Sequence, residues 1–75
     1  MKTIADMSNL RQALKRRWPV AKDTEIVFVL GRKEYAELYR DKSAHIYFSR
    51  ENPPRTVLGC DLIISVDDCF IACLK

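Results

Sequence analysis

Long apolar runs are missing from this sequence. No stretch approaches the roughly 20 apolar residues that a helix needs to cross a bilayer. The N-terminal segment, MKTIADMSNLRQ, has one lysine but no continuous apolar region, so we predict no secretory signal peptide. The three cysteines are an odd number in a chain without a predicted export signal. Reduced thiols and a cytoplasmic location are therefore expected.

Glycine and histidine are also scarce, with two glycines and one histidine in the chain. Gly31 stands between an apolar run and a helical pattern, in the segment GRKEYAE. Phosphate-binding loops need G-x-x-x-x-G-K-[ST], and dinucleotide-binding folds need G-x-G-x-x-G. The segment matches neither pattern, so we interpret Gly31 as a turn and helix N-cap residue. No cofactor is predicted.

Neither sign of charge is in large excess. Lys and Arg number 13 against 10 Asp and Glu, which gives a net charge of +3. This balance permits contact with nucleic acid but falls short of a dense positive field. The 75 residues allow one domain, residues 1–75, with a small core and a small stability margin. A homodimer would enlarge that core.

Hydrophobic periodicity predicts the first half of an α/β (α+β) domain. Apolar residues recur at helical spacing over residues 7–17, which we predict to be a helix. Asp6 or Ser8 would cap its start, and Pro19 would end it. Residues 26–30, IVFVL, are apolar on both faces, so they are expected to form a central strand covered on two sides.

The next segments alternate between helix and strand patterns. Residues 32–41 are predicted to be a second helix with Tyr35, Leu38 and Tyr39 on its core face. Residues 44–48 read as a strand. The segment that follows, residues 49–55, contains two adjacent prolines and is expected to be an exposed, stiff loop.

The C-terminal part predicts two further strands, residues 60–66 and 69–74, joined by a turn at Asp67-Asp68. We expect a tight hairpin in which Val66 faces Cys69 and Ile64 faces Ile71. The overall expectation is two helices packed on a roughly four-stranded mixed sheet that ends in this hairpin.

The cysteines and the histidine are the candidates for catalysis or metal binding. Structural zinc sites usually bring ligands in close pairs such as C-x2-C, and Cys60, Cys69, Cys73 and His45 lack that spacing. The hairpin register would place all three sulfurs on one strand face as small hydrophobes. No metal site is predicted. A small enzyme centred on Cys60, Cys69 or His45 is the third hypothesis, since an activated thiol needs a base.

Basic residues near the first helix end suggest nucleic acid as an alternative partner. Arginine pairs with phosphate, and tryptophan can stack on bases. The same charges also suit a helix C-terminus, where the dipole is negative. The residues for this alternative are Arg11, Lys15, Arg16, Arg17 and Arg32.

Aromatic residues exceed what a small core can hold. Tyr35, Tyr39, Tyr47 and Phe48 are not expected to fit inside together, and a remaining aromatic patch would mark a protein-binding surface. The predicted partner-binding residues are Trp18, Tyr35, Tyr39, Asn52, Pro53, Pro54 and Arg55.

Two segments resemble the C-terminal part of tailed-bacteriophage major capsid proteins. They are IVFVLGRKEYAELY at residues 26–39 and VLGCDLIISVDDCFIACL at residues 57–74. In that family an apolar strand and a helix are followed by a Leu-Gly-Val-Pro-Val strand, an acidic turn and a final strand. Here Asp61 stands where the family has proline, and the chain is too short for the spine helix and extended arm of a shell protein.

The resemblance implies a stand-alone module of phage or prophage origin that does not assemble a capsid. Small phage modules of this size commonly act on a host or virion protein. The leading hypothesis is therefore a small non-enzymatic protein that binds a partner protein in the host cytoplasm.

Overall fold

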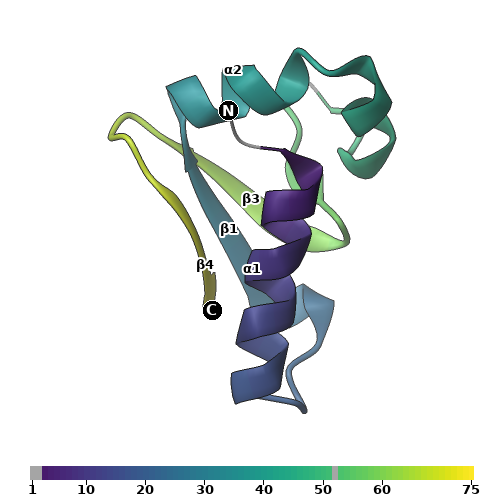
Figure 1. Cartoon of the computed structure of the whole chain (residues 1–75), viewed down its shortest axis with the longest axis vertical. Coiled ribbons are helices and arrows are strands. Elements are labelled where there is room, and N and C mark those ends of the chain that lie inside the picture. Colours follow the sequence, from purple (N-terminus) through teal and green to yellow (C-terminus); the bar gives the residue numbers. More distant parts are fainter. Residues whose placement is uncertain (1–2, 52) are drawn as a thin grey trace.

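The computed structural model describes residues 3–51 and 53–75. In this part of the chain the elements are, in order, α1 (Ile4–Arg17), η1 (Asp23–Glu25), β1 (Ile26–Gly31), α2 (Arg32–Tyr39), η2 (Lys42–Tyr47), β2 (Thr56–Val57), β3 (Cys60–Ser65) and β4 (Phe70–Leu74), where η denotes a 3-10 helix. The predicted α+β class is confirmed. Helix α1 lies along one face of a four-stranded mixed sheet, and α2 crosses the sheet's end (Figure 1).

Helix α1 starts three residues earlier than expected, because Thr3 rather than Asp6 or Ser8 is its N-cap. The Thr3 hydroxyl accepts a hydrogen bond from the N–H of Asp6 at 3.3 Å, and the Asp6 carboxylate accepts one from the N–H of Thr3 at 2.9 Å. This reciprocal capping box satisfies two backbone donors at once. The helix ends at Arg17, as predicted from Pro19. In the described residues no helix is long and apolar enough to cross a bilayer.

The sheet order is β2-β3-β1-β4, with β1 parallel to β3 and antiparallel to β4. The prediction that residues 26–30 form a central strand is confirmed. The predicted C-terminal hairpin is wrong, because β1 inserts between β3 and β4. Ile64 pairs with Leu30, and Ile71 pairs with Val29. This arrangement gives the most apolar strand two hydrogen-bonded neighbours, whereas a hairpin would leave it at an edge.

The core lies on one face of the sheet, beneath α1 and α2. Its fully buried members include Ile26, Phe28 and Leu30 from β1 and Met7 from α1. The expectation that both faces of β1 are covered is partly met. On the second face Val27 is 8% exposed, but Val29 is only half-buried. There Val29 lies between Ile63 and Ile71, whose side chains are 53% and 50% exposed.

The predicted strand at residues 44–48 is wrong. Those residues fall mainly in η2, whose N-cap Asp41 accepts hydrogen bonds from the N–H and hydroxyl of Ser43 at 3.0 and 2.7 Å. Ala44 and Phe48 are buried, whereas Ile46 between them is 80% exposed. In a strand these three side chains would share one face, so the burial is helical rather than alternating.

The fourth strand is instead the short β2, which pairs with β3 through a two-residue turn at Leu58-Gly59. Both turn residues have positive φ, 55° and 78°, as a tight type I′ hairpin requires.

Candidate functional site

The predicted partner-binding residues do not form one surface. Trp18 is the C-cap of α1, whereas Tyr35 and Tyr39 belong to α2. Figure 1 shows the C-terminal end of α1 and helix α2 at opposite ends of the molecule. Residues 53–55 precede β2, and Asn52 lies outside the described residues.

The aromatic side chains gather where α2 meets η2. The rings of Tyr39 and His45 stack with centroids 4.1 Å apart and an interplanar angle of 25°. Phe48 meets Tyr39 edge-on at 5.5 Å and Tyr35 edge-on at 6.0 Å. Contacts of this kind stabilise a pair of rings beyond the area that they bury, so the cluster holds its rings in defined orientations.

A hydrogen bond fastens the cluster to the backbone. His45 donates from Nε2 to the carbonyl oxygen of Tyr39 at 2.6 Å. Tyr39 is the last residue of α2, and carbonyls at a helix end lack partners within the helix. The lone histidine is therefore a helix-capping residue on the surface rather than a free base.

Some of these aromatic side chains are buried in the core, and others are exposed. Phe48 is 7% exposed and Tyr35 is half-buried, and burial, followed by the neighbouring Tyr39, raises the pKa of the Tyr35 hydroxyl. Tyr39 is 38% exposed, Tyr47 44% and Ile46 80%. We call the exposed set Tyr39, His45, Ile46 and Tyr47 the aromatic surface. Exposed aromatic and apolar side chains of this kind are often found at protein-binding sites.

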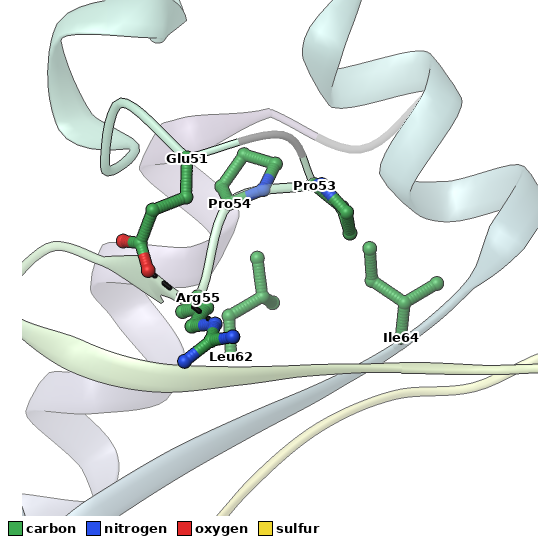
Figure 2. Close-up of a pocket in the computed structure, with 6 residues that line it drawn as sticks. All are labelled: Glu51, Pro53, Pro54, Arg55, Leu62 and Ile64. Atoms are coloured by element: carbon green, nitrogen blue, oxygen red, sulfur yellow. Dashed lines mark ion pairs between the residues drawn. The ribbon is translucent and has the colours of Figure 1, made fainter.

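A cavity of about 410 Å³ lies beside the proline loop. Figure 2 shows Pro53 and Pro54 across the cavity from Leu62 and Ile64, which rise from β3. Glu51 and Arg55 form an ion pair at 3.4 Å at one side. The cavity volume falls in the range of small-molecule pockets. The ion pair is exposed to solvent and therefore contributes little to stability. Three of the predicted loop residues therefore line one hollow, separate from Trp18.

Of the five basic residues predicted to contact nucleic acid, two make contacts within the fold. Lys15 Nζ lies 2.7 Å from Asp23 Oδ1, and Arg11 Nη1 lies 3.5 Å from Asp23 Oδ2. Arg11 Nη1 also donates to the carbonyl oxygen of Leu58 at 3.1 Å. These contacts connect α1 to η1 and to the β2–β3 turn, and the hydrogen bond from Lys15 lowers the pKa of Asp23.

The remaining basic residues lie apart from one another. Arg16 and Arg17 are exposed at the end of α1. The Arg17 guanidinium lies 5.0 Å from the centre of the Trp18 ring, a cation–π distance. Arg32 begins α2, at the opposite end of the molecule (Figure 1). The structure therefore does not bring the five into one positive patch.

The thiols do not share one face, contrary to the expectation from the hairpin. Cys60 is fully buried in the core, and burial raises the pKa of its thiol. Cys73 pairs with Val27 and belongs to the opposite face. Cys69 Sγ lies 3.7 Å from the carbonyl oxygen of Val29. Among the described residues no group of three or more His, Cys, Asp or Glu side chains is arranged to hold a metal ion.

Two residues that sequence reasoning did not single out belong to these regions. Ile46 was predicted to lie in a strand over residues 44–48. Asp41 and Ser43 are a helix-capping pair, and this signal could have revealed the 3-10 turn that exposes Ile46. Glu51 lines the cavity, and no pattern in the sequence pointed to it.

Comparison with protein-family models, curated proteins and solved structures finds no match to this chain. The capsid resemblance therefore stays a prediction.

Proposed function

We propose that this chain is a small non-enzymatic protein that binds a partner protein through the aromatic surface. The observation that carries the proposal is the exposure of Ile46 at 80%, Tyr47 at 44% and Tyr39 at 38% on one short segment. Protein-binding hot spots are enriched in tyrosine and cluster in well-packed regions.

The support beneath the aromatic surface favours binding over simple exposure. Tyr39 stacks on the His45 ring and meets the Phe48 ring edge-on. The N-cap Asp41 orders the start of η2. A surface that is already ordered loses less conformational entropy when a partner docks. The partner we propose is a folded protein that presents an apolar patch with a hydrogen-bond acceptor for the tyrosine hydroxyls.

The origin of the partner follows from the resemblance to phage capsid proteins. We place the chain among phage or prophage modules that act on a host protein or a virion component in the host cytoplasm. All three cysteines are free thiols, as a reducing compartment would keep them.

The experiment is a pull-down from host lysate with the purified chain, repeated after nuclease treatment. Ile46→Asp should remove the specific partner, because a carboxylate cannot enter an apolar interface without a large desolvation cost. Val20→Asp is the matched control, since Val20 is 91% exposed but lies in the connector after α1. We expect the partner to remain bound to this variant.

Two outcomes would contradict the proposal. If Ile46→Asp and Tyr47→Ala both retain the partner, the aromatic surface does not bind it. If every captured protein disappears after nuclease, the contact is through nucleic acid. In that case the affinity should also fall steeply with salt.

A further inference from the structure

Strand β4 forms one edge of the sheet. Strand β4 is the last strand of the sheet order, and among the described residues no strand pairs with its outer side. Figure 1 shows it at the outside of the sheet. Its sequence, FIACL, has no charge, proline or glycine. Native proteins usually protect such an edge with charges, prolines, bulges or a covering element.

The opposite edge of the same sheet is protected. Strand β2 has two residues, Thr56 and Val57, and follows two prolines. Phe48 forms a β-bridge to Val57 on the outer side. Among the described residues, the outer side of β2 therefore has a backbone partner, whereas no strand pairs with the outer side of β4.

The backbone groups of β4 alternate in direction. Lys75 donates its N–H to the carbonyl of Glu25 at 2.9 Å, and Cys69 accepts from the N–H of Gly31 at 2.8 Å. In an antiparallel pair, hydrogen-bonded and non-hydrogen-bonded positions alternate. Ala72 and Leu74 therefore direct their N–H and C=O groups away from β1, toward the open edge.

The same strand carries part of the uncovered apolar face. Ile71 is 50% exposed beside Val29, with Ile63 beyond it.

We infer that a second copy of this chain pairs with β4 through its own β4, antiparallel, across a two-fold axis. An antiparallel edge is self-complementary, so one strand supplies both sides of such an interface. The pairing would join the two sheets and keep Ile71 of both copies on the same face. Lys75, which follows the strand, is already paired with Asp61 of its own chain, so the two copies do not bring unpaired lysines together.

The test is the mass of the chain across a concentration series, measured by light scattering and sedimentation, together with hydrogen exchange at Ala72. We expect a species of twice 8.7 kDa and an Ala72 amide whose protection rises with the dimer fraction. Ile71→Lys should weaken dimerisation about tenfold or more, because the joined edge would bring two like charges close together.

Ile63→Lys is the matched control. Ile63 lies on the same face and is equally exposed, but it belongs to the interior strand β3. Edge pairing predicts that this variant remains a dimer. Equal loss of the dimer in both variants would mean that the sheets stack face to face instead, and would overturn the inference. A single 8.7 kDa species at every concentration, or an Ala72 amide that exchanges freely in the dimer, would overturn it as well. Circular dichroism of each variant separates loss of pairing from loss of folding.

Discussion

The backbone of Asp67 crosses directly over Gly31. A Cβ atom at Gly31 would lie 2.7 Å from the carbonyl oxygen of Asp67 and 3.0 Å from the Cα of Asp68. The reason is topological. The connection from β3 to β4 must pass over the C-terminal end of β1, since β1 lies between them. Gly31 has a φ of −68°, so this position needs glycine for space and not for its backbone conformation.

Gly31→Ala should destabilise the protein by about 1–3 kcal/mol, the usual cost of forcing extra atoms into a packed site. The measurement is urea unfolding followed by circular dichroism. Gly59 supplies the comparison, because its φ is 78° and a Cβ there would meet nothing nearer than 3.6 Å. Gly59→Ala should therefore lose about 1 kcal/mol through its backbone alone, and Gly59→Asn less. An unchanged urea midpoint for Gly31→Ala would refute the crossing.

Acid should weaken the fold partly through Asp23. Its pKa is lowered below 3.8, first by the hydrogen bond from Lys15 and then by the charges of Lys15 and Arg11. A carboxyl group with a lower pKa in the folded state stabilises the fold above its unfolded pKa. That contribution is lost as the pH falls through the folded value. We therefore expect the free energy of unfolding to decline as the pH drops below about 4.

Asp23→Asn should make this decline shallower and cost about 0.2–1 kcal/mol at pH 7, the range for solvent-exposed ion pairs. Part of the decline should persist, because the Ser43 hydroxyl and N–H also lower the pKa of Asp41. Unfolding curves at a series of pH values would measure both. Identical pH profiles for the variant and the parent chain would show that the Asp23 pairs do not form in solution.

Two isoleucines with opposite exposure should differ in their contribution to stability. Ile26 is fully buried, whereas Ile46 is 80% exposed. Ile26→Ala should cost about 2–5 kcal/mol, enough to unfold much of a domain with a small stability margin. Ile46→Ala should change stability by less than about 0.5 kcal/mol. Thermal unfolding measures both, and a large loss at Ile46 would mean that η2 packs more deeply than the structure shows.

Cys60 should be the slowest thiol to react. Burial in the core raises the pKa of its thiol, and the Asp23 carboxylate adds to this effect. The thiolate is the reactive form, so labelling of Cys60 in the folded chain should require unfolding. A maleimide time course with mass spectrometry would test this, with the urea-unfolded chain as the reference. Rapid labelling of folded Cys60 would instead support the hypothesis of an activated nucleophile.

Sequence periodicity predicted the structure correctly where the hydrophobic pattern of a segment fits only one type of secondary structure. The segment containing Met7, Leu10 and Leu14 has a clear helical stripe, and α1 forms there and ends before Pro19. Residues 26–30 are continuously apolar, and they form the central strand. In α2, Leu38 is buried as its place on the stripe predicts.

The predicted structure was wrong where a segment could adopt more than one structure or pair with more than one strand. The alternation of residues 60–66 and 69–74 fits a hairpin as well as it fits two strands on either side of β1. Similarly, the segment 44–48 has apolar residues that suit a strand, but the contacts of Asp41 with Ser43 stabilise a 3-10 helix there. The hydrophobic pattern of a single segment does not indicate which strand pairing buries more apolar surface in the folded chain.

The candidate site shows the same division. The sequence alone was enough to predict that the aromatics exceed the core, because their number and the chain length set that limit. Only the tertiary structure decided that Phe48 is buried while Tyr39 and Tyr47 are exposed, and that Trp18 lies at the other end of the molecule. The strand type, helix stripe and turn residues are local properties of the chain. The sheet order and the uncovered face depend on which distant segments compete for β1, and that competition is resolved only when the whole chain folds.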